Sequence, residues 1–176
     1  MSTPPPKIET ARLILREWSL ADVDRFAEIY SDPEVMKYVG DRRPRTREET
    51  YRRKERSLAD YREHGFGMWA VVRKEDGRII GRCGLQYLDD GEVEIGWLLE
   101  RSAWGHGYAY EAARACIEYG LEELKLPRIV AVAMPDNTAS VRLMEKLGMR
   151  LVGEGEYYGV KCVRYILEAA QHQLGG

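Results

Sequence analysis

The sequence predicts a mixed α/β fold: a central, mostly antiparallel, twisted sheet with one splayed parallel strand pair and helices on both faces. Three apolar runs between residues 67 and 99, joined by two Asp-Gly turns, indicate an antiparallel meander. Apolar residues then recur every three or four positions over 109–124, as in an amphipathic helix. A β-branched run at 128–134 follows, so the last meander strand, this helix and this run should form a right-handed crossover between parallel strands.

An arm and a strand are expected at the start of the chain. Residues 1–7 include three consecutive prolines and are expected to form a flexible N-terminal arm, with a single domain over 8–176. Apolar and charged residues alternate over 10–18, a pattern that predicts a strand.

Two helices should precede the meander, because two capping boxes occur there. Ser19 and Asp22 have the required spacing, and Thr46 and Glu49 repeat it. Helices are therefore expected to run to about residue 30 and to about residue 64, where a glycine is placed to end the second.

The C-terminal part predicts a short helix and a final strand pair. Asn137 is expected to cap this helix and Gly148 to close it. The strands are expected around 151–158 and 160–167.

Size and charge limit the classes of function. A chain of 176 residues with 44% hydrophobic residues can bury a substantial core without disulfides or metals. The 27 basic and 29 acidic residues give a formal charge of -2, which provides no overall attraction to nucleic acid. Direct nucleic-acid binding is not expected.

The chain is expected to be cytoplasmic. Its N-terminus lacks the apolar core of a signal peptide, and no apolar run approaches the roughly 20 residues of a membrane span. No membrane partner is therefore expected, and the oligomeric state, monomer or homodimer, is left open.

The cysteines and histidines do not form a metal or redox motif. Cys83, Cys116 and Cys162 are odd in number and widely spaced, so buried structural thiols are expected. The three histidines are equally scattered, and no metal is expected.

A glycine-rich loop, residues 104–109, lies between a buried strand and the start of the amphipathic helix. Free N–H groups in the first helical turn and the positive end of the helix dipole can hold a phosphate. A plain strand-to-helix turn is an equally good interpretation of Gly-x-Gly alone. The third glycine of a dinucleotide fingerprint and the Lys-Ser or Lys-Thr of a P-loop are missing, so neither NAD nor ATP is favoured.

Four motifs follow one another in the chain: Thr10-x-Arg12-Leu13-x-Leu15-Arg16, Asp32-Pro33, Trp104-Gly-His-Gly-Tyr-Ala-x-Glu111-Ala112 and Asn137-x-x-Ser140. In this order they resemble the GNAT superfamily of N-acetyltransferases, most of all the Rim group of ribosomal-protein N-terminal acetyltransferases. The resemblance covers nearly the whole domain and implies the acyl-CoA N-acyltransferase fold with acetyl-CoA as cosubstrate.

The resemblance also implies the cosubstrate site. Backbone amides of residues 105–109 would hold the pyrophosphate, strand residues 98–99 would pair with pantetheine, and Asn137 would contact the pantetheine arm. Trp104 stands where many members have Gln or Arg. The cofactor-binding residues implied are Leu98, Leu99, Trp104, Gly105, His106, Gly107, Tyr108, Ala109, Asn137 and Ser140.

Acetyl transfer needs a proton for the departing thiolate. Many family members place a tyrosine seven residues after the asparagine, but this chain has Met144 there, which has no proton to give. The Rim-like pattern leaves Ser140 as the acid. Helix capping by Asn137 and Ser140 is an equal alternative.

The amine must also lose a proton, and Glu94 lies on the strand that should line the acceptor cleft. Its carboxylate could accept this proton directly or through water. A solvated glutamate on the strand face, or a water chain with no dedicated base, is the alternative. A backbone N–H near Leu98 is the implied donor to the oxyanion.

Two charged clusters bear on the acceptor. A basic stretch over 42–56 is interleaved with acids and is expected to be a solvated helix face, although it would favour acidic acceptors if it lined the cleft. Glu154, Glu156, Tyr157 and Tyr158 would favour cationic amines instead.

The function expected is acetyl transfer from acetyl-CoA to the N-terminal α-amine of a protein or peptide, with Ser140 and Glu94 as catalytic residues. A small amine, such as an aminoglycoside, a polyamine or an amino acid, is the alternative acceptor. Alternatives of other classes are a CoA-binding or interaction module without turnover, and RNA or ribosome binding through the basic stretch.

Overall fold

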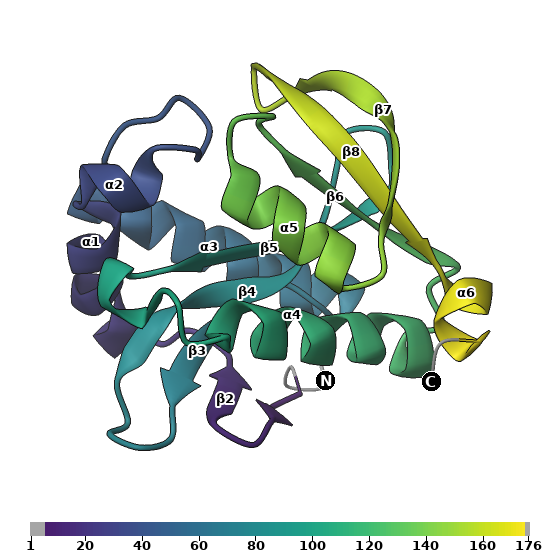
Figure 1. Cartoon of the computed structure of the whole chain (residues 1–176). Coiled ribbons are helices and arrows are strands. Elements are labelled where there is room, and N and C mark those ends of the chain that lie inside the picture. The colour runs from purple at the N-terminus through teal and green to yellow at the C-terminus, as the bar shows by residue number, and fades with distance from the viewer. Residues whose placement is uncertain (1–5, 175–176) are drawn as a thin grey trace.

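The computed structural model describes residues 6–174 (Figure 1). Most of the predicted N-terminal arm, residues 1–5, lies outside this range. At its end, the backbone carbonyl of Pro6 accepts a hydrogen bond of 3.0 Å from the indole of Trp69. The chain is therefore attached to the sheet before the first strand begins.

The N-terminal third of the chain forms two short strands and then helices. The elements are β1 (Ile8–Glu9), β2 (Leu13–Arg16), a 3₁₀ turn (Leu20–Asp22), α1 (Val23–Tyr30), α2 (Pro33–Met36) and α3 (Arg47–His64). Both predicted capping boxes are present, at Ser19 and at Thr46. Gly65 ends α3 with φ of +77°, a left-handed conformation that glycine adopts without a steric cost.

The middle of the chain contains the predicted meander and the crossover helix. Its elements are β3 (Met68–Arg73), β4 (Ile79–Tyr87), β5 (Val93–Leu99), a 3₁₀ turn (Arg101–Ala103), α4 (Tyr108–Glu118), a π-helical turn (Tyr119–Glu123) and β6 (Arg128–Ala133). The helix predicted over 109–124 is therefore α-helical for its first three turns and widens at its C-terminal end.

The C-terminal part contains α5 (Thr138–Lys146), β7 (Arg150–Tyr157), β8 (Val160–Glu168) and α6 (Ala169–Leu174). The short helix and both strands were predicted, whereas β1 and α6 were not. Two and six residues are too few to establish a hydrophobic period, so these elements leave little trace in the sequence.

The strands form an eight-stranded sheet in the order β1-β2-β3-β4-β5-β6-β8-β7. Every neighbouring pair is antiparallel except β5 and β6, which are parallel. The parallel ladder is short, with Glu94 opposite Val130. The predicted fold class is confirmed, including the splayed parallel pair.

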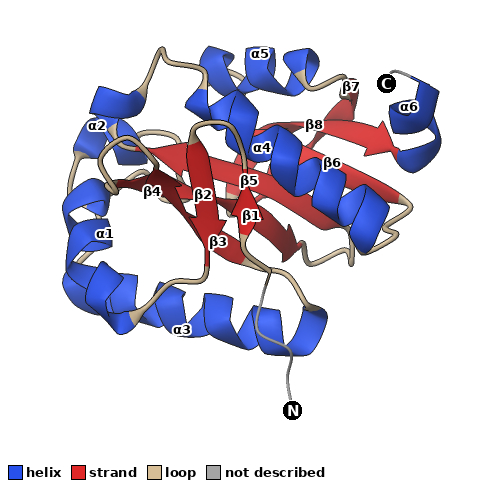
Figure 2. Cartoon of the chain, turned by 90° about the horizontal axis from the view of Figure 1, so that it is seen from below, coloured by secondary structure: helices blue, strands red, loops and turns tan. Residues whose placement is uncertain are grey.

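Helices cover both faces of the sheet, with α4 and α5 on one side and α1 and α3 on the other (Figures 1 and 2). The larger core cluster lies between the sheet and α4. A smaller cluster packs α1 and α2 against the opposite face through an aromatic group in which Trp18 stacks on Phe26. Leu99 belongs to the first cluster and Leu98 to the second, so β5 is buried on both faces.

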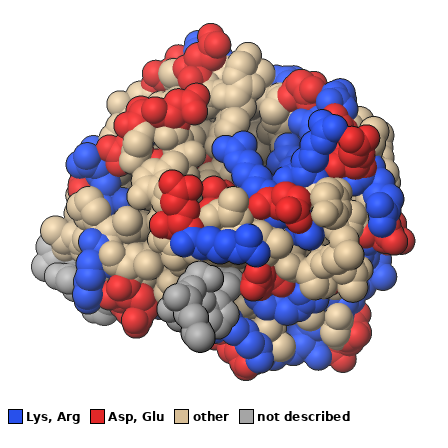
Figure 3. Space-filling model, turned by 180° about the vertical axis from the view of Figure 1, so that it is seen from behind, with Lys and Arg blue, Asp and Glu red and all other residues tan. Residues whose placement is uncertain are grey.

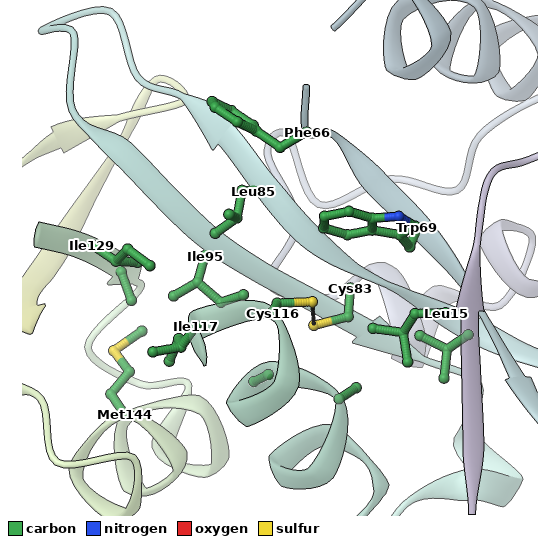
Figure 4. Packing of buried hydrophobic residues seen from close by; sticks show 14 of the residues in the cluster. Leu15, Phe66, Trp69, Cys83, Leu85, Ile95, Cys116, Ile117, Ile129 and Met144 are labelled. Atoms are coloured by element: carbon green, nitrogen blue, oxygen red, sulfur yellow. Dashed lines mark hydrogen bonds between the residues drawn. The ribbon is translucent and has the colours of Figure 1, made fainter. Parts of the chain in front are cut away.

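All three cysteines are buried free thiols, as predicted. Figure 4 shows Cys83 of β4 and Cys116 of α4 facing each other across the main core, with sulfur atoms 3.8 Å apart. Burial raises the pKa of the Cys116 thiol well above its ordinary value, which keeps it protonated and unreactive.

Candidate active site

The site begins where β5 leaves β6. Beyond the Glu94–Val130 pair the two strands separate, while β5 remains paired with β4 along its whole length. Glu100 donates its N–H to the carbonyl of Ile80, 2.8 Å away. Because an antiparallel ladder alternates the direction of its backbone groups, Trp97 and Leu99 turn their N–H and C=O groups toward the gap. Leu98, expected to pair with pantetheine, has its backbone directed toward β4 instead.

A cleft of about 1010 Å³ opens from this gap. It is lined by β4 and β5, the glycine-rich loop, α5, the region of α1 to α3 and the turn between β7 and β8. Figure 3 shows a hollow in the molecular surface with basic side chains at its border. The cleft joins the predicted cosubstrate loop and the predicted acceptor strand in one continuous space.

The glycine-rich loop has the backbone conformation that a phosphate cradle needs. Gly105 and Gly107 have φ of +78° and +79°, and α4 begins immediately afterwards at Tyr108. The first-turn N–H groups of α4 have no partners within the helix, and residues 108–110 line the cleft. Trp104, 47% exposed, donates its indole N–H to the carbonyl of Leu99 over 2.9 Å and so ties the loop to β5.

Residues near the start of the chain support the glycine-rich loop through hydrogen bonds. The carboxylate of Glu111 accepts hydrogen bonds from the hydroxyl of Thr10 and from both the backbone N–H and the Nε of Arg12, at 2.6–2.7 Å. Arg12 also donates to the carbonyl of His106 over 2.9 Å and lies over the ring of Tyr108. Hydrogen bonds therefore join two of the motifs quoted above, the one that contains Thr10 and Arg12 and the one that contains Glu111.

Asn137 and Ser140 have different roles at the start of α5. The Asn137 side-chain oxygen accepts the N–H of Ser140 over 3.3 Å, so Asn137 is the helix cap. The Ser140 hydroxyl caps nothing: its oxygen accepts the indole N–H of Trp97 over 3.2 Å. Within the described residues it donates to no acceptor, which leaves its proton available to a group in the cleft.

Glu94 lies inside the cleft wall and is 5% exposed. One carboxylate oxygen, Oε2, accepts hydrogen bonds from the hydroxyl of Tyr158 and from Gln86, whose amide is 3.0 Å away. Oε1 accepts none from the described residues. The interpretation as a solvated strand-face glutamate is therefore wrong, and a buried carboxylate with one free oxygen takes its place.

Burial sets the basicity of this carboxylate. Desolvation raises the pKa of Glu94 above its ordinary value, although hydrogen bonds from Tyr158 and Gln86 and the charge of Arg82 act in the opposite direction. Burial and the neighbouring carboxylate likewise raise the pKa of Tyr158, so the phenol stays protonated and remains the donor.

The hairpin between β7 and β8 brings Tyr158 to this position. Tyr158 and Gly159 form its two-residue turn, with φ of +55° and +76°, between the paired residues Tyr157 and Val160. A type I′ turn has this backbone and matches the twist of the strands, although a tyrosine is unusual in it. The sequence analysis placed Tyr158 only in a cluster with Glu154, Glu156 and Tyr157. Nothing in the sequence indicated that its hydroxyl would contact Glu94.

A family model described as an acetyltransferase (GNAT) domain matches residues 12–150 of this chain. The chain belongs to the GNAT acetyltransferase family.

Other proteins resemble this chain in sequence and in structure. A protein of Bacillus licheniformis named uncharacterized N-acetyltransferase p20 is 37% identical over 147 residues, which are 82% of each chain. The structure of a GNAT family acetyltransferase from Bacillus anthracis is 29% identical, with a TM-score of 0.81 over 94% of this chain and 99% of the other. A coenzyme A complex of RimL, a ribosomal L7/L12 alpha-N-protein acetyltransferase, has a TM-score of 0.80 over 94% and 99% at 16% identity, a likeness of fold alone.

The basic stretch of this GNAT acetyltransferase is partly a solvated face, as expected, and partly a cleft wall. Arg43, Arg47 and Arg52 form ion pairs with acidic neighbours at the surface. Arg52, Arg53 and Arg56 line the cleft, and of these Arg53 is half-buried. Of the opposing cluster, Tyr158 lines the cleft, whereas Glu154 is exposed and pairs with Lys161.

Two absences hold for the part of the GNAT acetyltransferase that the structure describes. Over residues 6–174, His, Cys, Asp and Glu side chains form no group of three that could hold a metal ion. In the same range no helix has both the length and the apolar character needed to span a membrane.

Proposed function

We propose that this enzyme transfers the acetyl group of acetyl-CoA to a primary amine, the N-terminal α-amine of a protein or peptide. Glu94 accepts the amine proton and Ser140 protonates the thiolate. The glycine-rich loop, residues 104–109, holds the pyrophosphate of the cosubstrate. The parting of β5 and β6 provides backbone groups for its pantetheine arm.

The observation that carries this proposal is the placement of a buried carboxylate and a free serine hydroxyl in one cleft. Glu94 is the last residue of β5 that pairs with β6. Ser140 contacts Trp97, three residues further along β5. A thioester lying in the gap beside residues 95–99 would be between the two side chains. The acid and the base therefore face the reacting carbonyl from the sides that the chemistry requires.

The reaction balances with these two groups. The neutral amine nitrogen attacks the thioester carbon, and the carbonyl electrons move to oxygen. The nitrogen loses one proton to Oε1 of Glu94, and collapse of the intermediate breaks the C–S bond. Ser140 gives its proton to the departing sulfur and regains one from water, while Glu94 releases its proton to solvent. The products are an N-substituted acetamide and the CoA thiol.

Backbone groups can stabilise the oxyanion in this scheme. The N–H groups of Trp97 and Leu99 point into the gap, so either one can donate to the developing negative charge. These two neighbours, rather than Leu98 itself, are the proposed donors to the oxyanion. A fixed N–H of this kind typically contributes about 2.7–4 kcal/mol to the transition state.

Two arguments support an α-amine as acceptor. The motif resemblance is to the Rim group, and RimL, a ribosomal L7/L12 alpha-N-protein acetyltransferase, has the same fold. The cleft, of about 1010 Å³, also has room for the end of a peptide chain.

Calorimetric titration with acetyl-CoA tests the cosubstrate site. Gly105→Asp introduces both a side chain at positive φ and a negative charge in the loop, and should weaken binding at least tenfold. Gly91→Asp is the matched control: Gly91 has φ of +84° and open space around it, but lies in the β4–β5 turn outside the cleft. Equal affinities of the two variants would contradict a phosphate loop at residues 104–109.

Thiol release on the same samples tests the acceptor. The panel contains N-terminal peptides, the same peptides with a blocked α-amine, and small amines. Turnover confined to free α-amines of peptides is the expected result. Turnover with small amines alone would transfer the assignment to a small acceptor, and binding without turnover on any amine would indicate a non-catalytic CoA-binding module.

A further inference from the structure

We infer that Arg53 and Arg82 form a binding site for a carboxylate of the acceptor, so that the enzyme acetylates amines that carry a carboxylate close to the nitrogen. This inference rests on the proposed function and names the acceptor more closely. It predicts either the α-carboxylate of an amino acid or the side-chain carboxylate of an acidic residue at a peptide N-terminus.

The two arginines enter the cleft from different elements. Arg53 comes from α3 and Arg82 from β4, and both line the cleft. Their guanidinium carbons lie 5.8 and 6.0 Å from the centroid of the Tyr30 ring, so both charges lie next to one aromatic side chain. The two positive groups repel each other, because the charge of Arg82 lowers the pKa of Arg53, and an anion bound beside both would offset this repulsion.

No acidic side chain in the described residues contacts either guanidinium, although the charge of Arg82 lowers the pKa of Glu94. Neither Arg53 nor Arg82 takes part in an ion pair or a side-chain hydrogen bond within residues 6–174, although most arginines of the neighbouring basic stretch are paired. The Nε of Arg82 is enclosed and has no acceptor there. A buried donor without a partner costs about 1–3 kcal/mol, and such groups in folded proteins usually mark a missing partner.

The electrostatics agree with an anion site at these residues. Burial lowers the pKa of Arg53 below its ordinary value, and the positive charge of Arg82 lowers it further. A carboxylate bound beside Arg53 would raise this pKa. Arg56 differs from these two arginines because it has an acidic neighbour. Burial raises the pKa of Asp60, and the charge of Arg56 acts to lower it.

The position of Arg82 connects the anion site to the base. On β4, Arg82, Gly84 and Gln86 point to one face, and their partners on β5 are Leu98, Gly96 and Glu94. The two facing glycines contribute no side chains between Arg82 and Glu94, and their places are taken by the Gly67 backbone beside Gly84 and by the Met68 side chain beside Gly96. The strand positions of Arg82 and Glu94 are four residues apart, about 13 Å, and both residues line the cleft. That separation suits an amine and a carboxylate on one small group.

These arginines are separate from the predicted phosphate loop. Arg82 shares its face of the sheet with Leu98, which packs with α1 and α2, whereas α4 and its N-terminal loop lie on the other face. A phosphate of the cosubstrate held at residues 104–109 is therefore on the opposite side of β5. The arginines face the acceptor.

The test compares matched acid and amide acceptors by steady-state thiol release. The pairs are glutamate with glutamine, an amino acid with its α-amide, and peptides that begin with Asp or Glu with those that begin with Asn or Gln. Wild type should favour the acid of at least one pair by about tenfold to a hundredfold in kcat/KM, because a charged hydrogen-bond pair is gained. The pair that responds identifies the source of the carboxylate.

Arg53→Gln and Arg82→Gln should each reduce the acid-to-amide ratio at least tenfold, mainly through KM of the acceptor, with KM for acetyl-CoA unchanged. Arg62→Gln, an exposed arginine on the same helix outside the cleft, should leave the ratio as in wild type. The acids should also raise the thermal unfolding temperature of wild type more than the amides do, without acetyl-CoA present. If Arg82→Gln does not fold, Arg53→Gln and the thermal shift of wild type decide whether the carboxylate site exists.

Equal use of acids and amides by wild type, or an equal loss of both in the arginine variants, would overturn the carboxylate site while leaving the acetyltransferase intact. Absence of turnover with every amine, despite acetyl-CoA binding, would instead count against the proposed function. In that case a thermal shift selective for acids that Arg53→Gln removes would still support the anion site, and a shift that is unselective would reject it.

Discussion

The hydroxyl of Tyr158 donates a hydrogen bond to the carboxylate of Glu94, a residue 64 positions earlier in the chain. Tyr158 stands at the tip of the β7–β8 hairpin, and Glu94 at the last paired position of the parallel ladder. More than half of the tyrosine is exposed, at 54%, but its hydroxyl end is inserted beside the buried carboxylate. The hairpin thereby places a neutral donor against one oxygen of the proposed base and leaves the other oxygen free.

Replacing the proposed base should reduce the rate of the chemical step. Glu94→Gln keeps the size and most hydrogen bonds of the side chain but cannot accept a proton, so kcat should fall about a hundredfold or more. Affinity for acetyl-CoA, measured by calorimetry, should be unchanged. A kcat within threefold of wild type would show that water accepts the proton without Glu94.

The pH dependence follows from the direction of the pKa shift. Activity requires ionised Glu94, and burial raises its pKa above the ordinary 4.5, so kcat/KM should fall as pH drops through a value higher than 4.5. The profile of kcat/KM measures this acid limb. In Glu94→Gln the limb should disappear; a limb that persists there belongs to another group.

Tyr158→Phe should move the acid limb. The hydrogen bond from Tyr158 lowers the pKa of Glu94, so its removal raises this pKa further and shifts the limb to higher pH. The matched control is Tyr157→Phe, one residue earlier, whose hydroxyl contacts Arg164 instead. Identical profiles for wild type and Tyr158→Phe would mean that the contact does not tune the base.

Ser140→Ala should separate catalysis from helix capping. The variant loses the proton donor, so kcat should decrease about tenfold to a hundredfold. Since Asn137 still caps α5, the free energy of unfolding should change by only about 1 kcal/mol, from the lost contact with Trp97. Thr138→Ala, at an exposed position of the same helix, serves as control. A large loss of stability with unchanged kcat would assign Ser140 a structural role.

Glu111→Gln should destabilise the fold and loosen the glycine-rich loop. The carboxylate accepts three hydrogen bonds from Thr10 and Arg12, and their weakening should cost about 1–3 kcal/mol of unfolding free energy. Denaturant unfolding measures this value. Glu118→Gln, which alters a surface pair with Arg114 on the same helix, should leave stability nearly unchanged.

The same variant has a defined pH response. Although burial acts to raise it, hydrogen bonds from Thr10 and Arg12 lower the pKa of Glu111 below 4.5. Its contribution to stability is therefore complete above pH 4.5 and is lost as pH falls through the lowered value. The difference between wild type and Glu111→Gln should narrow in acid; a constant difference would contradict the charged contact.

The sequence by itself determined the features that depend on a few neighbouring residues. The capping boxes at Ser19 and Thr46, the glycine end of α3 and the Asp-Gly turns of the meander act within one turn of chain, so their residue types predict them. The period of α4 and the parallel crossover followed in the same way. The motif order then indicated the family, and the glycine loop, Asn137, Ser140 and Glu94 were found as candidates.

Only the tertiary structure decided how these candidates meet and what surrounds them. The insertion of β8 between β6 and β7 carries Tyr158 to Glu94, and the pairing of β4 with β5 places Arg82 on the same face of the sheet as Glu94. The burial of Glu94 and the position of Arg53 in the cleft likewise depend on elements distant in sequence. Such contacts arise from strand order and helix packing, which join residues by shape and burial and leave no spacing that can be read along the chain.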